Sequence, residues 1–171
     1  MTVSARKVSL AMHIKAIRLV IIVAALSVFL DQLTKAIVRK YVAARGVIEV
    51  ISGFFEIRYI DNTGAAFGMF RGRNTIFIII SILVIGFVFV YYRQFKGNLW
   101  MRLSLGLLLG GALGNLIDRV IFRSVTDFIR VRWWFIHLRW WPIFNLADAF
   151  ICIGAAMLMV GMFRRNEFTE E

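Results

Sequence analysis

The stretch from Trp100 to Phe122, WMRLSLGLLLGGALGNLIDRVIF, decides the fold. It is long and apolar enough to form a helix across the hydrocarbon of a bilayer, which takes about 20 residues. Its three clustered glycines, Gly110, Gly111 and Gly114, would let neighbouring helices approach closely, as small residues do in membrane bundles. Ordinary packing is a sufficient explanation for these glycines.

Three further apolar stretches, at about 17–38, 75–92 and 144–163, predict three more transmembrane helices. Of the 171 residues, 60% are hydrophobic and 15% aromatic, which is typical of a membrane protein. The net charge of +11 is better explained by anionic lipid headgroups than by nucleic acid. We therefore expect membrane lipids, and no nucleic acid, as partners. No repeat or linker divides the chain, so residues 1–171 are expected to form one domain.

The first apolar stretch follows four basic residues and lacks a small-residue cleavage site, which predicts an uncleaved anchor. Counting lysines and arginines on the two sides of the membrane does not decide the orientation. The basic residues directly before the first helix favour a cytoplasmic N-terminus, and four spans place the C-terminus on the same side.

Two long segments on the opposite side are not ordinary loops. From Val47 to Phe70 the chain is rich in β-branched and aromatic residues punctuated by glycines, which predicts short strands and turns. Between Val125 and Pro142, tryptophans alternate with arginines, a composition typical of the headgroup level. We expect both segments to lie on or dip into the interface.

Metal chemistry is not favoured by the residues available. A single cysteine, Cys152, excludes an internal disulfide framework and any cysteine-rich metal site. His13 and His137 are the only histidines, so zinc is not expected. We expect no metal and no cofactor.

The aspartates lie within spans or near their ends, and they are Asp31, Asp61, Asp118, Asp127 and Asp148. Four helix ends lie on one face of the membrane. They are the end of the first helix, the start of the second, the end of the third and the start of the fourth. All five aspartates therefore lie on that face. Carboxylates at or below the interface are energetically expensive, and they usually pair or take part in chemistry.

A structural role stays open for three of these aspartates. Asp31 and Lys35 are four residues apart with the acid first, the favourable order for an ion pair on one helix face. Asp118 could join a structural hydrogen-bond cluster with Asn115, one turn before it. Asp61 is interpreted as a turn residue.

Asp127 and Asp148 have no cation close to them in the sequence, and Asn145 adds a polar edge three residues before Asp148. Two aspartates within a few ångströms of each other cannot both ionise easily. One keeps a proton while the other acts as a base toward water. This is the chemistry of aspartic peptidases, and it needs no metal, cysteine or histidine.

Five short motifs occur in order along the chain. They are Asp31-Gln-Leu-Thr-Lys35, Asn62-Thr-Gly-Ala-Ala-Phe67, Gly114-Asn-Leu-Ile-Asp-Arg119, Val125-Thr-Asp-Phe128 and Phe144-Asn-Leu-Ala-Asp148. In these motifs the chain resembles the lipoprotein signal peptidase family, also called signal peptidase II. Members of this family are aspartic peptidases of the bacterial inner membrane. Each motif is weak alone, but five in order on one membrane face are highly specific.

The resemblance implies that Asp127 and Asp148 are the catalytic pair. Eight further residues would line, brace or support the site, and they are Asp31, Lys35, Asn62, Gly64, Asn115, Asp118, Arg119 and Asn145. The implied fold is mainly α, a four-transmembrane-helix bundle with a small extracytoplasmic β-element and an interfacial helix. It also implies cytoplasmic termini and an active site toward the outer leaflet.

The implied activity is removal of signal peptides from diacylglyceryl-modified prolipoproteins, with cleavage just before the lipidated cysteine. One aspartate would activate water while its protonated partner binds the scissile carbonyl. The sequence does not assign these two roles. The resemblance also leads us to expect a monomer and a site targeted by globomycin-type peptide antibiotics.

Two other functions remain as alternatives. A small proton-coupled transporter would have carboxylates near the midplane and a water path to both faces, and the clustering of aspartates on one face argues against it. A noncatalytic assembly or lipid-binding subunit would tolerate the loss of either Asp127 or Asp148.

Overall fold

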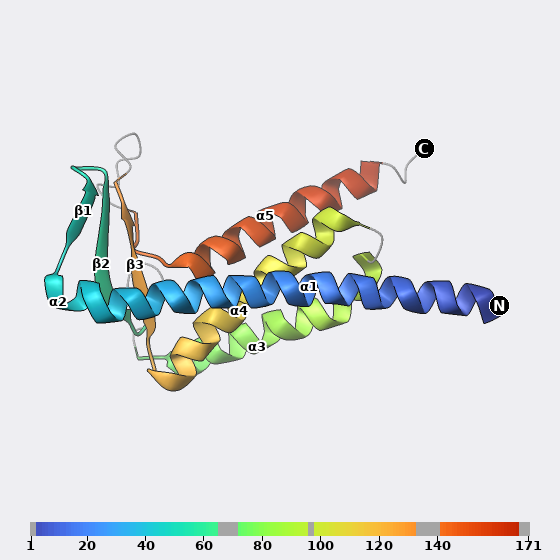
Figure 1. Cartoon of the computed structure of the whole chain (residues 1–171), viewed down its shortest axis with the longest axis horizontal. Coiled ribbons are helices and arrows are strands. Elements are labelled where there is room, and N and C mark those ends of the chain that lie inside the picture. Colours follow the sequence, from blue (N-terminus) through green and yellow to red (C-terminus); the bar gives the residue numbers. More distant parts are fainter. Residues whose placement is uncertain (1–2, 65–71, 96–97, 133–140, 168–171) are drawn as a thin grey trace.

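The computed structural model describes residues 3–64, 72–95, 98–132 and 141–167. Four long helices form a bundle, and a small sheet lies across one end of it (Figure 1). The helices are α1 (Val3–Ile37), α3 (Asn74–Tyr91), α4 (Leu99–Ile121) and α5 (Leu146–Glu167). Each contains a stretch that is long and apolar enough to cross a membrane. The expected four-helix membrane architecture is thus confirmed.

The sheet has three antiparallel strands in the order β1 (Ile48–Ile51), β2 (Phe55–Asn62) and β3 (Val125–Val131). The first two strands confirm the β-element expected from the first long segment. β3 comes from the second long segment. The tryptophans and arginines of that segment predict an interfacial stretch, and the strand was not predicted. Trp133, Trp134 and Trp140 lie outside the described residues.

Two helices, α1 and α5, differ at their ends from the apolar stretches of the sequence. α1 begins at Val3 and continues past Ile37 through a π-helical turn, η1 (Val38–Val42), and a short helix, α2 (Ala43–Arg45). α5 begins two residues after Phe144, because Phe144 exchanges backbone hydrogen bonds of 2.8 and 3.1 Å with Ile129 of β3 and stays extended.

Apart from the four long helices, the described helical pieces are short. They are η1, α2 and the 3-10 turn η3 (Tyr92–Phe95). The expected interfacial helix therefore has no separate counterpart in the part of the chain that the structure describes.

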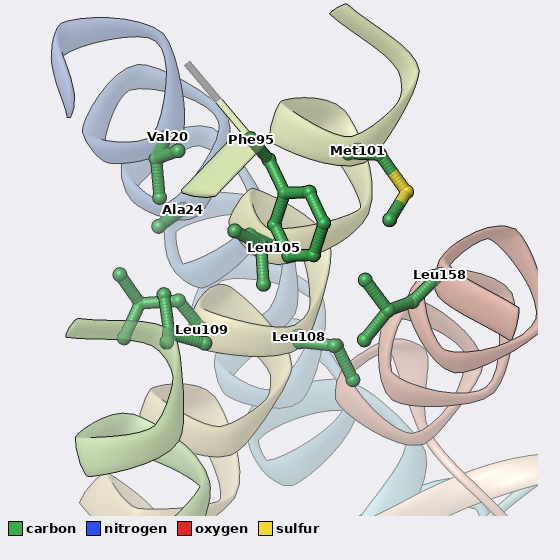
Figure 2. Packing of buried hydrophobic residues seen from close by; sticks show 9 residues of the cluster. Val20, Ala24, Phe95, Met101, Leu105, Leu108, Leu109 and Leu158 are labelled. Atoms are coloured by element: carbon green, nitrogen blue, oxygen red, sulfur yellow. The ribbon is translucent and has the colours of Figure 1, made fainter. Parts of the chain in front are cut away.

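The central helix is α4, with the other three packed around it. Of its most apolar stretch, 61% is buried, against 22% in α1, 11% in α3 and 17% in α5. The buried apolar cluster at the end opposite the sheet draws Val20 and Ala24 from α1, Leu105 and Leu109 from α4, and Leu158 from α5 (Figure 2). The outer helices expose apolar side chains on their remaining faces, as lipid contact requires.

Glycines on two sides of α4 allow its neighbours to approach. A Cβ atom at Gly110 would overlap Cβ of Ser27 and lie 2.9 Å from the carbonyl oxygen of Ala24, both in α1. A Cβ atom at Gly111 would overlap the carbonyl oxygen of Ala147 in α5. These are close backbone contacts, so α4 has no room for side chains at these two positions.

We predict that Gly110→Ala lowers the free energy of unfolding by about 1–3 kcal/mol, because the new methyl group overpacks the α1–α4 contact. Gly86→Ala in α3 is the matched control, since a Cβ atom there meets nothing within 4 Å. Alanine at that control position should be neutral or slightly stabilising through helix propensity. The measurement is unfolding of both variants in the same detergent, and equal stability changes would contradict the packing argument.

Candidate active site

A cavity of about 670 Å³ lies among α3, α4, α5 and the sheet. Most of its wall is apolar and comes from membrane-spanning residues such as Ile80, Val84 and Ile151. Its polar lining includes Asn62, Gly64, Asn115, Arg119, Asp127 and Asp148. Six of the ten site residues expected from the sequence thus share one cavity.

Asp127 lies in β3 and is only 3% exposed. Its Oδ2 accepts a hydrogen bond of 2.7 Å from Asn62 Nδ2, and its Oδ1 accepts one of 2.7 Å from Asn145 Nδ2. Burial, and secondly the negative charge of Asp148, raise the pKa of Asp127 to about 7. The carboxyl group therefore keeps a proton at pH values where an exposed aspartate has lost it.

Asp148 lies in the first turn of α5 and is oriented by a reciprocal cap. Asn145 Oδ1 accepts a hydrogen bond of 3.0 Å from the backbone N–H of Asp148, and Asp148 Oδ2 accepts one of 3.2 Å from the backbone N–H of Asn145. This is a capping box with asparagine and aspartate as the two partners. Asn115 Nδ2 donates to the other oxygen, Oδ1, over 2.7 Å. Asn145 thus contacts both candidate catalytic carboxylates.

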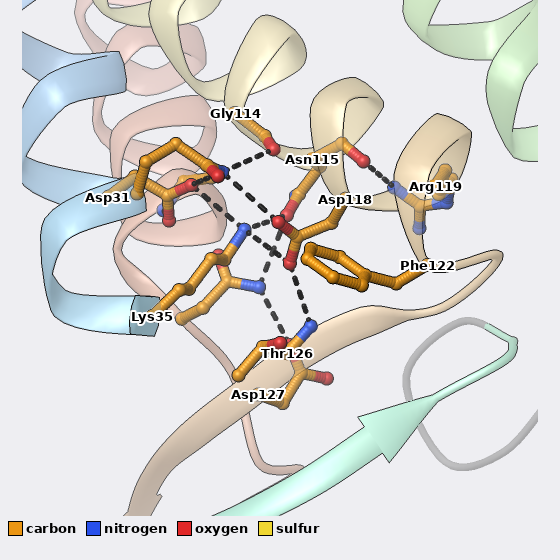
Figure 3. Close-up of polar contacts among 12 residues, drawn as sticks. Asp31, Lys35, Gly114, Asn115, Asp118, Arg119, Phe122, Thr126 and Asp127 are labelled. Atoms are coloured by element: carbon orange, nitrogen blue, oxygen red, sulfur yellow. Dashed lines mark hydrogen bonds and ion pairs between the residues drawn. The ribbon is translucent and has the colours of Figure 1, made fainter. Parts of the chain in front are cut away.

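Behind the cavity, a fully buried ion cluster surrounds Lys35 (Figure 3). Lys35 Nζ lies 2.8 Å from Asp31 Oδ2 and 3.4 Å from Asp118 Oδ2, and it donates to Asn115 Oδ1 over 3.0 Å. Because ammonium groups only donate, the amide oxygen of Asn115 must face Lys35 and its NH₂ group must face Asp148. The lysine therefore orients the asparagine that binds Asp148.

The two supporting aspartates each bind a backbone N–H next to one candidate catalytic residue. Asp31 Oδ1 accepts from the N–H of Ala147 over 2.9 Å, directly before Asp148. Asp118 Oδ2 accepts from the N–H of Thr126 over 2.9 Å, directly before Asp127. The cluster thereby fixes the start of α5 and the start of β3 relative to α1 and α4.

Arg119, Asn62 and Gly64 complete the cavity wall. The Arg119 guanidinium stacks 5.0 Å from the ring centre of Phe77, and none of the ion pairs among the described residues includes it. Asn62 Oδ1 accepts from the N–H of Gly64 over 2.9 Å, which closes a turn after β2. This turn aims the Asn62 amide at Asp127.

All ten site residues expected from the sequence thus lie in the cavity wall or in the hydrogen-bond network behind it. The exception among the aspartates is Asp61, and its interpretation as a turn residue was wrong. It is an exposed residue of β2 that accepts a hydrogen bond of 2.6 Å from the Tyr59 hydroxyl.

Three residues of the network were not identified from the sequence. Gln32 Nε2 donates to Asp118 Oδ1 over 3.1 Å, and Arg39 Nη1 donates to Thr126 Oγ1 over 2.8 Å. The available signal for Arg39 was its position four residues after Lys35, on the same helix face.

Comparisons with known proteins agree on one family. The family model described as signal peptidase (SPase) II matches residues 23–164. A lipoprotein signal peptidase of Halothermothrix orenii is 40% identical over 149 residues, covering 87% of this chain and 98% of that protein. Another, of Syntrophotalea carbinolica, is 38% identical over 157 residues, with 90% and 96% covered.

Solved structures show the same architecture. A bacterial membrane enzyme solved by the in meso method at 2.3 Å resolution superposes with a TM-score of 0.78 at 34% identity, covering 86% of this chain and 88% of that one. A second, solved at 1.9 Å, gives a TM-score of 0.73 at 35% identity, with 84% and 91% covered. The family resemblance inferred from the five motifs is thus confirmed.

We predict that Lys35→Met lowers the free energy of unfolding by about 3–5 kcal/mol, because it leaves Asp31 and Asp118 buried without their shared cation. Arg45→Met, at an exposed position at the end of α2, is the matched control and should be nearly neutral. Thermal unfolding of both variants in one detergent gives the comparison. A Lys35 variant as stable as the Arg45 variant would show that the cluster does not hold the site together.

Proposed function

This chain belongs to the signal peptidase II family, and we propose that it removes signal peptides from diacylglyceryl-modified prolipoproteins, cleaving just before the lipidated cysteine. The observation that carries the proposal is that Asp127 and Asp148, both held by asparagine hydrogen bonds, share the polar end of an otherwise apolar cavity in a membrane bundle. Water activation by such a pair suits peptide hydrolysis.

We propose that Asp127 carries the shared proton and that Asp148 acts as the general base. The pKa of Asp127 is raised to about 7 by burial and by Asp148, while Asp148 is half-buried and accepts hydrogen bonds from Asn115 and Asn145. Asp148 takes a proton from water as the water oxygen attacks the scissile carbonyl carbon. Asp127 hydrogen-bonds the carbonyl oxygen and stabilises the charge that develops there. The proton held by Asp148 then passes to the departing amine of the lipidated cysteine.

The apolar wall of the cavity suits a lipid-anchored substrate. Ile80 and Val84 of α3 and Ile151 of α5 belong to spans whose other faces expose apolar side chains. The acyl chains can stay among these helices while the peptide reaches the carboxylates at the sheet end. Arg119 at the cavity wall is a hydrogen-bond donor available to a peptide carbonyl.

We also propose that both termini are cytoplasmic and that the sheet lies at the outer leaflet. The start of α1 and the end of α5 both lie at the end of the bundle opposite the sheet (Figure 1). The proposal further includes a monomeric enzyme and competition by globomycin-type peptide antibiotics for the cavity. The transporter alternative has no support, because the buried aspartates Asp31, Asp118 and Asp127 gather at the sheet end of the bundle in one network.

We predict that Asp127→Asn and Asp148→Asn each lower kcat at least about 10³-fold, because a shared proton needs two carboxyl groups. Asp61→Asn is the matched control, since Asp61 is exposed and does not line the cavity. Cleavage of a diacylglyceryl prolipopeptide by purified protein measures the effect, with unfolding temperature as the check on folding. Near-normal turnover by either catalytic variant would defeat the assignment.

A second prediction concerns pH and metal. Because the pKa of Asp127 is raised to about 7, the singly protonated pair is lost as pH rises through that value. The rate should therefore fall on the alkaline side of about pH 7, and again in acid once the pair holds two protons, which gives a bell-shaped profile. Activity should persist in excess EDTA. Loss of cleavage in EDTA that is restored by Mg²⁺ or Mn²⁺ would overturn the mechanism.

A further inference from the structure

Charged side chains repeat along one face of α1 and its π-helical extension. Asp31, Lys35 and Arg39 follow one another at intervals of four residues. The first two belong to the buried cluster, and the third reaches both the end of α4 and the start of β3. Arg39 therefore continues the polar contact of α1 toward the sheet.

Arg39 makes three contacts around the turn that joins α4 to β3. Its Nη1 donates to Thr126 Oγ1 over 2.8 Å and lies 3.6 Å from Asp118 Oδ1. Its guanidinium carbon lies 4.6 Å from the ring centre of Phe122, which caps the C-terminus of α4. The side chain thus contacts residues before and after the turn.

This turn is tight and strained. Arg123 has a φ of 60°, which is energetically unfavourable for a residue with a side chain. The chain leaves α4 at Phe122 and enters β3 at Val125, so little backbone separates the helix from Thr126. A strained connection persists where its surroundings hold it in place, and Arg39 contacts both of its ends.

The π-helical turn η1, which contains Arg39, also packs against β3. Val38 and Val42, at the two ends of η1, are buried in a cluster with Phe128 of β3. Thr126 and Phe128 therefore both contact this turn of the first helix, and Asp127 lies between them. An irregular helical turn of this kind often occurs at functional sites.

We propose that Arg39 is a positioning residue for the reaction, which acts through Thr126 to fix the carboxyl group of Asp127 in the cavity. Arg39 is not among the described residues that line the cavity, and its contacts are with Thr126, Asp118 and Phe122 behind it. The inference rests on the proposed peptidase function, because it assigns Asp127 a part in the chemistry. A small displacement of a catalytic group can cost up to about 100-fold in rate.

The test compares kcat, KM and unfolding temperature of the full-length purified enzyme with a diacylglyceryl prolipopeptide. Arg39→Met removes the contacts of the guanidinium, and Thr126→Val removes the hydroxyl while conserving shape. We expect kcat to fall about tenfold in Arg39→Met and less in Thr126→Val, with KM within about twofold of wild type. Thr126→Ser keeps the hydroxyl and should recover most of the loss. Lys40→Met is the control, because Lys40 is an exposed neighbour outside this network.

The double variant Arg39→Met/Thr126→Val decides whether the two residues act together. If they act through their hydrogen bond, the double variant should be no slower than Arg39→Met alone. Additive losses would overturn the inference, as would a lower unfolding temperature with normal kcat in Arg39→Met. An absence of cleavage by the wild type would instead overturn the proposed function. If the wild type cleaves the substrate and Arg39→Met cleaves it with the same kcat, this inference alone would be overturned.

Discussion

A buried ammonium group sets the arrangement of the site. Lys35 Nζ is fully removed from solvent, and a cation in that position requires anionic partners and hydrogen-bond acceptors. Asp31 and Asp118 supply the charge, and Asn115 supplies the acceptor. Asp31 and Asp118 also accept hydrogen bonds from the backbone N–H groups of Ala147 and Thr126. Through these two aspartates, the lysine determines where the chain begins α5 and β3.

Two charge-balanced groups lie side by side in this structure. Behind the cavity, Lys35 and Arg39 offset Asp31 and Asp118. In the cavity wall, Arg119 places one positive charge near Asp127 and Asp148, which in the proposed mechanism carry a single negative charge between them. The amides of Asn115 and Asn145 join the two groups without adding charge. Neutrality within each group is what a medium of low dielectric demands.

The sequence predicts the helices and the first hairpin for identifiable physical reasons, whereas the full set of site residues came from the family resemblance of its five motifs. Long apolar stretches leave few alternatives to membrane helices, and the spacing of Asp31 and Lys35 indicates their pairing directly. Other features depend on contacts between distant segments. The pairing of Asp61 with Thr126 makes Asp61 a strand residue, although its neighbours in the sequence favour a turn. The orientation of the Asn115 amide likewise depends on Lys35 and Asp148, which belong to two other helices.

The ion pair of Asp31 and Lys35 also bears on how the protein is made. Both residues belong to α1, so their pair can form while α4 and α5 are still on the ribosome. The first span can therefore enter the bilayer with these two charges already compensated, at a depth where a lone carboxylate or ammonium would oppose insertion. Asp118 arrives later with α4 and meets a lysine that already lies in the membrane. The order of synthesis is thus also an order in which the buried charges of Asp31, Lys35 and Asp118 can each find an opposite one.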